Sequence, residues 1–365
     1  MTLFSQRPII LAAIAIFLLN FFFLVSKDGS SFCGAVPTLK HGNTTPKSPS
    51  RITAAFKSSE EKLAFAMFFS STVDQTEDLA NDKYFISARM LVWQLLHSPR
   101  TRSRRNVDVV ILVTPSVSES RRRVLEADGA IIQPIDFLRK EWGEFRETRW
   151  EDMLAKLRGW EMTQYSRVAM LDTDIILREP IDHIFDDEAT QFKKTLSIDN
   201  VRNKPPQGAP PLPDSYVLAG VGETFSPEHP FPPFWDGDSV DGGLYKKGYF
   251  NGGFLVFSPS KTMFEYFVWM IKTPNSFIAE LAEQNLLNVV HDWNGPAPWQ
   301  TLNSTWNIMY PNDDDLKGGL RTMHQKWFEN PKADEKKNGD MVKEEMRRAR
   351  WEMQGWYDAL EASSR

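Results

Sequence analysis

Short apolar runs alternate with segments of helical spacing along most of this chain, and this alternation limits the folds open to it. Residues 63–71, 107–113 and 168–171 are apolar and of strand length. Between them, residues 84–97 and 154–165 carry apolar side chains at the three- and four-residue intervals of a helix. Strands that alternate with helices favour a parallel sheet, buried on both faces, that binds ligands at its strand carboxyl ends. The sequence therefore predicts an α/β fold with a mostly parallel central sheet.

The pattern continues with a helix over 117–127, a strand over 130–132, and helices over 261–272 and 276–290. Residues 249–260 are expected to form a turn at 251–253, then a strand and a stop. Arg121, Arg122 and Arg123 are expected on a solvated face of the first of these helices. Residues 200–248 interrupt the pattern with prolines and glycines, which predicts a long irregular segment, either a functional loop or disorder.

The composition excludes a basic nucleic-acid-binding protein. Of the 365 residues, 25 % are charged and 41 % hydrophobic, which is normal for a globular protein. The net charge of −5 leaves no overall basic field to attract nucleic acid. Because Cys33 is the single cysteine, no intrachain disulfide can form.

The N-terminal region predicts a membrane anchor. Residues 8–26 carry no charge, and as a helix they would span about 28 Å, close to the thickness of a bilayer core. A cleaved signal peptide is the alternative, but its apolar core is usually only about 7–15 residues long and ends beside small residues. We expect a short cytosolic tail over 1–7, a transmembrane signal anchor over 8–26 and a flexible stem over 27–58.

A folded domain is predicted over 59–330, followed by a charged C-terminal helix over 331–365. The helix is amphipathic because apolar side chains recur every three or four residues at Val342, Met346, Ala349, Met353, Trp356 and Leu360. We expect this apolar face to pack back on the folded domain.

Two aspartates, Asp172 and Asp174, follow the predicted strand 168–171 directly. Two carboxylates at the end of a buried strand repel each other, so a positive group between them is expected. Their hard oxygen atoms suit a divalent cation at the point where the phosphates of a nucleotide would lie. Two further D-x-D stretches, 236–238 and 313–315, lie in polar, loop-like settings instead.

Several short segments support a resemblance when they are taken in order: FAMFFSS (65–71), KLRGW (156–160), RVAMLDTD (167–174), PIDHIFD (180–186), YFNGGFLVFSPS (249–260), EQNLLN (283–288), STWN (304–307) and HQKW (324–327). Over about residues 62–328 the chain resembles glycosyltransferase family 8, the glycogenin-like retaining transferases, and its fungal members most closely. The resemblance implies a GT-A fold, a Rossmann-like nucleotide-diphospho-sugar transferase domain, after the N-terminal transmembrane helix. The closing segment lacks the family's Gly and Pro, and Glu283 replaces the usual Asp.

The resemblance also implies roles for particular residues. A divalent metal is expected on Asp172, Asp174 and His324, and imidazole with carboxylates suits Mn²⁺ better than Mg²⁺. The donor, a UDP-sugar, is expected to contact Lys156, Asp172, Thr173, Asp174, Gly253 and Lys326. The catalytic candidates near the donor sugar are Gln284, Glu283 and Asn251. Phe231, Phe234 and Trp235 would stack on an acceptor sugar or, as is more common, form part of a self-packing or disordered loop.

The expected function is that of a D-x-D- and Mn²⁺-dependent retaining hexosyltransferase that acts on a glycan or glycoprotein acceptor. The expected location is the Golgi membrane, as a single-pass type II protein, with the endoplasmic reticulum second; a homodimer is compatible with the sequence. A catalytically inactive member that binds a nucleotide sugar or a partner protein is the first alternative. The second is a haloacid dehalogenase-type phosphatase, which needs Thr or Val where Ile176 stands.

Overall fold

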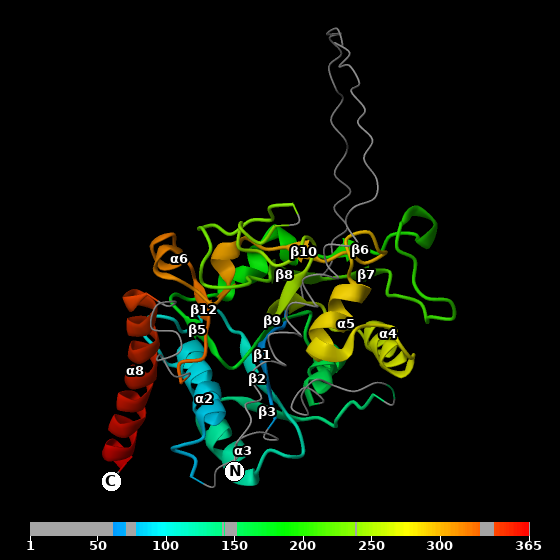
Figure 1. Cartoon of the computed structure of the whole chain (residues 1–365). Coiled ribbons are helices and arrows are strands. Elements are labelled where there is room, and N and C mark those ends of the chain that lie inside the picture. The colour runs from blue at the N-terminus through cyan, green and yellow to red at the C-terminus, as the bar shows by residue number, and fades with distance from the viewer. Residues whose placement is uncertain are drawn as a thin grey trace, which may run out of the picture. The chain divides into compact units, whose positions relative to one another are not determined.

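The computed structural model describes residues 61–70, 78–140, 142, 152–237, 239–328 and 339–364 (Figure 1). The predicted tail, anchor and stem lie outside these residues. Among the helices in the described part of the chain, none is long and apolar enough to cross a membrane.

The described strands are β1 (Leu63–Phe69), β2 (Asp108–Val113), β3 (Ile131–Pro134), β4 (Arg167–Leu171), β5 (Ile175–Leu177), β6 (Lys193–Lys194), β7 (Ser215–Tyr216), β8 (Leu218–Gly222), β9 (Phe250–Phe257), β10 (Gln300–Thr301), β11 (Ile308–Met309) and β12 (Thr322–His324). The α-helices are α2 (Lys83–Leu96), α3 (Glu119–Ala127), α4 (Lys261–Lys272), α5 (Ala282–Val290), α6 (Asp313–Lys317) and α8 (Asp340–Ser364). The 3-10 helices are η2 (Asp152–Glu161), η3 (Asp182–Asp186), η4 (Glu188–Thr190), η5 (Ile198–Asn200), η6 (Ala279–Leu281) and η7 (Ser304–Trp306).

Within the described residues, seven strands form the central sheet in the order β10-β8-β9-β4-β1-β2-β3. Strand β1 runs parallel to both β2 and β4, and β2 runs parallel to β3. Strand β9 is antiparallel to its neighbours β4 and β8. The fold is therefore mixed α/β with a mostly parallel central sheet, as predicted. A smaller sheet, β11-β12-β5, lies beyond the carboxyl end of β4.

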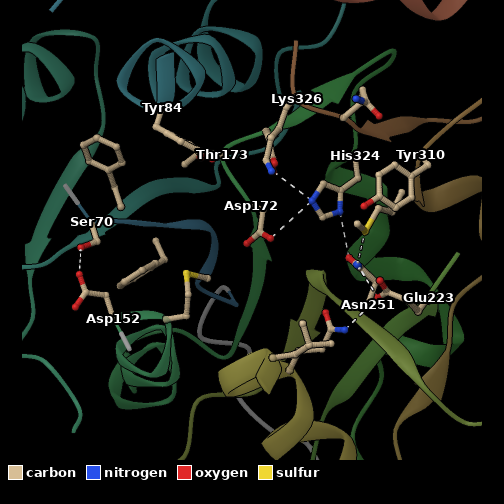
Figure 2. A pocket seen from close by; sticks show the side chains of 18 residues that line it. Ser70, Tyr84, Asp152, Asp172, Thr173, Glu223, Asn251, Tyr310, His324 and Lys326 are labelled. Carbon is tan, nitrogen blue, oxygen red and sulfur yellow. Dashed lines mark hydrogen bonds and ion pairs between the residues drawn. The ribbon is translucent and has the colours of Figure 1, made fainter. Parts of the chain in front are cut away.

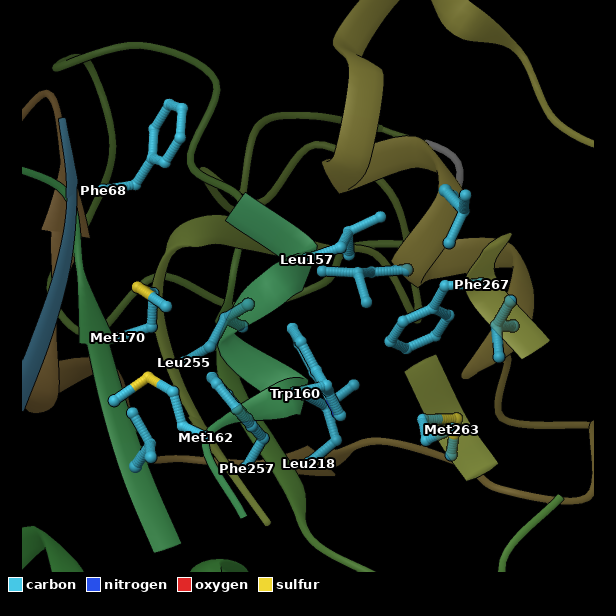
Figure 3. Close-up of a cluster of buried hydrophobic side chains, with 14 of the residues drawn as sticks. Phe68, Leu157, Trp160, Met162, Met170, Leu218, Leu255, Phe257, Met263 and Phe267 are labelled. Atoms are coloured by element: carbon cyan, nitrogen blue, oxygen red, sulfur yellow. The ribbon is translucent and has the colours of Figure 1, made fainter. Parts of the chain in front are cut away.

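The central sheet is buried on both faces, which explains why its strands are apolar without alternation. In β1, Ala64, Ala66 and Phe68 pack into one hydrophobic cluster, while the residues between them pack into a second. The first cluster is centred on Trp160, whose ring stacks on Phe257 at 3.8 Å between centroids and meets Phe267 edge-on at 5.0 Å (Figure 3).

The helix predicted over 154–165 is wrong in type and length, because the structure has the 3-10 helix η2 there. Tertiary contacts hold this segment: Lys156 donates to the Gly252 carbonyl, and the Trp160 carbonyl accepts from the Ser260 N–H. Gly159 also lowers the intrinsic helix preference. The tertiary contacts therefore outweigh the helical spacing of the sequence.

The predicted solvated face of 117–127 is wrong for Arg121, which is 4 % exposed. Its Nε and Nη2 donate to Asp82 Oδ2 at 2.9 and 2.7 Å. Asp82 also caps α2 by accepting the Phe85 N–H. Arg121 and Leu125 are one helical turn apart and share the buried face of α3. A buried ion pair therefore joins the starts of two helices.

The segment 200–248, predicted to be irregular, contains β8, which enters the central sheet between β10 and β9. The sequence of this strand, LAGVG, has two glycines and little β-branching, so its composition does not predict a strand. Phe231 and Trp235 pack against hydrophobic clusters, while Phe234 is 52 % exposed.

The predicted C-terminal helix is present as α8, which lies beside α2 (Figure 1). Val342, Ala349 and Met353 are buried in a third cluster with residues of α2 and α6. The polar loop predicted at 313–315 is wrong, since Asp313 begins helix α6.

Candidate active site

The two aspartates lie where β4 leaves the sheet. Strand β4 ends at Leu171, and the Asp172 N–H donates to the Gly253 carbonyl of β9 at 2.8 Å. The Ile175 N–H then bonds back to the Asp172 carbonyl, so the chain turns before β5. This turn exposes Asp172 and Asp174 to a pocket at the carboxyl end of β4.

His324 reaches the same point through strand pairing. It pairs with Ile175 in the antiparallel ladder of β12 and β5. Its Nε2 lies 3.2 Å from Asp174 Oδ1 and 3.8 Å from Asp172 Oδ2 (Figure 2). One ligand atom from each residue lies within 4.8 Å of the others. Two carboxylates and one imidazole at this spacing fit a single divalent cation.

Electrostatics within this Asp172–Asp174–His324 cluster favour the charged forms. Burial by itself would lower the pKa of His324, but the carboxylates of Asp174 and Asp172 raise it above its ordinary value. Burial by itself would raise the pKa of Asp174, but His324 and then Lys326 hold it below its usual range. Opposite charges therefore hold the His324 ring beside the two carboxylates.

Gly253 makes room for the cluster. A Cβ on Gly253 would collide with His324 Cε1 and lie 2.8 Å from Asp172 Oδ2. Because any other residue would push these two side chains apart, glycine is required at this position of β9. Gly253 thus lies beneath the cluster and does not line the pocket, and its expected contact with the donor stays a prediction.

Lys156 and Glu283 lie behind Asp172 and do not line the pocket. Lys156 is 3 % exposed; its Nζ donates to Asp172 Oδ1 at 2.5 Å and lies 3.7 Å from Glu283 Oε1. Burial lowers the pKa of Lys156, but Asp172 and Glu283 outweigh it and raise the pKa. Burial raises the pKa of Glu283 to about 7 against the opposing effect of Lys156. Lys156 therefore neutralises and orients Asp172 from behind, and Glu283 in turn holds Lys156.

The pocket in front of the cluster has a volume of about 480 Å³ (Figure 2). Of the residues singled out from sequence, it is lined by Asp172, Thr173, Asp174, Asn251, Gln284, His324 and Lys326. The structure therefore brings together most of the predicted site from four separate segments of the chain, while their individual roles stay predictions.

Glu223 lines the same pocket and was missed by the sequence analysis. It follows β8 directly, in the segment predicted to be irregular. Its Oε2 accepts from Asn251 Nδ2 at 2.8 Å and from Gln284 Nε2 at 3.1 Å. Burial raises the pKa of Glu223, and the hydrogen bond from Asn251 opposes that rise. Glu223 could have been predicted from the sequence because, like Asp172, it is a carboxylate that directly follows a short apolar run.

Ser70 and Asp152 form a second polar group of the pocket, away from Glu223 and Asn251 in Figure 2. Ser70 directly follows β1 and donates to Asp152 Oδ2 at 2.6 Å, while Thr114 donates to Ser70 at 3.0 Å. Ser70 belongs to the segment that resembles the family's nucleotide-binding strand, but Asp152 was not predicted.

No protein-family model matches the chain. An uncharacterised protein of Schizosaccharomyces pombe is 28 % identical over 276 residues, which cover 68 % of this chain and 69 % of that protein. Galactinol synthase 2 of Ajuga reptans is 29 % identical over 52 % of this chain and 61 % of that enzyme. The chain spans between half and two thirds of the length of the galactinol synthases that it matches.

Among solved structures, the galactosyltransferase LgtC in complex with donor and acceptor sugar analogs matches with a TM-score of 0.42. The two are 15 % identical, and the match covers 79 % of this chain and 96 % of LgtC. A TM-score of this size is too low to support an argument about fold or function.

A central α/β sheet that brings two aspartates and a histidine to one pocket, taken with the sequence matches to galactinol synthases, supports a glycosyltransferase. The sequence matches to galactinol synthases support the predicted resemblance to glycosyltransferase family 8. They also support a transferase enzyme.

Proposed function

We propose that the protein is a retaining hexosyltransferase that moves a hexose from a UDP-sugar to a glycan or glycoprotein acceptor. The observation that carries this proposal is the Asp172–Asp174–His324 cluster, which opens into a pocket that Asn251 and Gln284 also line. A pocket of about 480 Å³ is within the usual range for a small-molecule site.

The donor atoms of the cluster fit Mn²⁺, because the site combines two carboxylate oxygens with an imidazole nitrogen. Asp172 Oδ2, Asp174 Oδ1 and His324 Nε2 would hold the cation. When bound, such a cation supplies Lewis-acid stabilisation of the departing diphosphate.

The remaining residues have separable roles in this proposal. Lys326 lines the pocket and adds positive charge for the diphosphate. Lys156 acts through Asp172, which it holds from behind, and Glu283 acts through Lys156. Gln284 and Asn251 present polar groups on the side of the pocket assigned to the donor sugar.

The test is release of UDP by the purified full-length chain from a panel of UDP-sugars, with and without Mn²⁺. We expect Mn²⁺-dependent release from at least one donor. UDP that binds, as measured by calorimetry, without release from any donor would instead identify a catalytically inactive family member. That alternative is favoured by one observation, the Glu283 that replaces the usual Asp.

We further propose that residues 8–26 anchor the protein in the Golgi membrane as a type II protein, with residues 59–330 in the lumen. The support is the uncharged run itself and the Ser- and Pro-containing stem that follows it. Carbonate extraction should leave the full-length protein in the membrane pellet, and the domain should resist protease in sealed vesicles. Release of the protein, or its digestion, would contradict the anchor or the orientation.

A further inference from the structure

We propose that Glu223 is a positioning residue: through Asn251 it fixes the ring of His324 with Nε2 toward the metal cluster, and it holds Gln284 in the same pocket. This inference rests on the proposed function for the cation that the cluster holds. Glu223 does not itself belong to the cluster of potential ligands. It acts through two amide side chains that come from different elements, β9 and α5.

The first step concerns the orientation of the two amides. Glu223 Oε2 lies 2.8 Å from Asn251 Nδ2 and 3.1 Å from Gln284 Nε2. Both amides donate to this one oxygen, so both turn their NH₂ groups toward Glu223. The amide oxygens then face away from Glu223.

Independent hydrogen bonds support this orientation. Asn251 Oδ1 accepts the Gly253 N–H at 2.9 Å, and Gln284 Oε1 accepts the Gly252 N–H at 2.6 Å. A backbone N–H only donates, so each partner must be an oxygen. The carboxylate and the backbone of β9 therefore select the same orientation of both amides.

The second step concerns the tautomer of His324. Its Nδ1 lies 3.2 Å from Asn251 Oδ1. Because that oxygen can only accept, Nδ1 must carry the hydrogen and donate it. Once a cation replaces the Nε2 proton, the Nε2 lone pair is then directed to the side on which Asp172 and Asp174 lie. Metal-binding histidines usually donate their other ring N–H in this way, and the partner fixes the ring orientation.

A rival role for Glu223 is that of a reacting carboxylate, since it lines the pocket. The two roles predict opposite results for one pair of variants. Glu223→Gln keeps an acceptor oxygen for the two amides but removes the nucleophile. Glu223→Leu removes the acceptor as well, so Asn251 is free to rotate and its oxygen no longer orients the ring.

The first measurement is Mn²⁺ binding to the metal-free, full-length chain, followed by the electron paramagnetic resonance signal of free Mn²⁺. We expect Glu223→Leu to weaken Mn²⁺ binding roughly 10- to 100-fold, the usual effect of losing an outer partner of a ligand, and Glu223→Gln to stay close to wild type. In a His324→Ala background, Glu223→Leu should cause no further loss, because its effect passes through that ring.

Unchanged Mn²⁺ affinity in Glu223→Leu overturns the proposal. So does loss of UDP-sugar hydrolysis in Glu223→Gln with Mn²⁺ affinity unchanged, since that result identifies a reacting carboxylate. If Glu223→Leu does not fold, Glu223→Asp replaces it, because its side chain is one methylene shorter and moves the carboxylate away from the two amides. Unchanged Mn²⁺ affinity in Glu223→Asp would then overturn the proposal. The Mn²⁺ measurement needs no donor sugar. If the variants change Mn²⁺ affinity as expected but no UDP is released, only the proposed sugar transfer is contradicted. If the wild type binds no Mn²⁺, both the proposed function and this inference are overturned.

Discussion

Two acidic stretches of this chain look alike in sequence and differ in what the fold makes of them. Asp172-Thr173-Asp174 and Asp313-Asp314-Asp315 both contain a D-x-D, and each has a histidine nearby: His324 for the first, and His229, 3.6 Å from Asp315, for the second. Only the first forms a cluster of potential metal ligands among the described residues.

The difference lies in the local backbone. After β4 the chain turns, so Asp172 and Asp174 both reach the space in front of His324. In α6 successive side chains point about 100° apart, and the three carboxylates diverge.

Each carboxylate of α6 has its own structural partner. Asp313 accepts the N–H groups of Met341 and Val342 at the start of α8. Asp314 pairs with Lys317, and Asp315 closes a capping box with Asn312. A D-x-D that follows a buried strand therefore suits a cation, whereas a D-x-D at the start of a helix caps helices.

The largest expected effect is on catalysis. Asp172→Asn and Asp174→Asn should each lower the rate of Mn²⁺-dependent UDP release roughly a thousandfold or more, because the departing diphosphate loses its charge stabilisation. Without metal, both variants should stay folded at the assay temperature, and Asp172→Asn should melt lower than Asp174→Asn because it removes the main charge partner of buried Lys156.

Asp313→Asn is the matched control in the second stretch, and it should leave UDP release at the wild-type level. Unfolding of both Asp172→Asn and Asp174→Asn would mean that this pair is structural. Equal loss of activity in Asp313→Asn would remove the distinction between the two stretches.

The next effect is on metal affinity. His324→Ala should need at least about tenfold more Mn²⁺ for half-maximal UDP release. A proton and the cation compete for the ring, and the neighbouring carboxylates raise the pKa of His324 despite its burial. Mn²⁺ affinity of the wild type should therefore fall as the pH decreases from 8 to 6, and the variant should lose part of this dependence.

A Mn²⁺ titration of His324→Ala that matches wild type would show that the histidine is not a ligand. The control is His229→Ala, whose ring lies beside Asp315 in the second stretch. We expect its Mn²⁺ titration to follow wild type.

A smaller effect concerns the pH dependence of stability. Burial raises the pKa of Asp315 to about 6, so between pH 4 and 6 the folded chain binds a proton that the unfolded chain releases. The free energy of unfolding therefore decreases as the pH rises from 4 through 6, because buried Asp315 loses its proton. Asp315→Asn keeps an acceptor for the Asn312 N–H but has no carboxyl group to titrate. As the pH rises from 4 to 6, its free energy of unfolding should therefore increase by roughly 2 kcal/mol relative to that of wild type.

Denaturant unfolding of wild type and Asp315→Asn at pH 4, 5 and 6 measures this difference. Asp314→Asn, whose side chain is exposed, is the control and should show no such trend. A constant difference between Asp315→Asn and wild type would contradict the raised pKa.

The smallest effect is on the start of α8. Asp313→Ala removes the acceptor for two N–H groups and should lower the free energy of unfolding by about 1 kcal/mol, the usual effect of losing a cap. Calorimetric melting of the full-length chain measures this change. Reduced Mn²⁺ binding in Asp313→Ala, rather than reduced stability, would show that the two stretches are coupled.

Several features of this protein follow from the sequence alone. Buried strands need continuous apolar runs, so β1, β2 and β4 and the carboxylates after β4 are visible in the chain itself. Helices α4 and α8 are equally visible, because their apolar residues recur at helical spacing. The order of short family motifs was enough to predict family 8.

Only the tertiary structure decided how distant residues meet. His324 joins Asp174 because β12 pairs with β5, and strand pairing between remote segments leaves no local trace in sequence. Arg121 was expected on a solvated face and Lys156 at the donor, but each is buried against a carboxylate that the fold supplies. Glu223 reaches the pocket because β8, a glycine-containing strand of weak propensity, is stabilised by its neighbours in the sheet, so its role depends on packing and not on local preference.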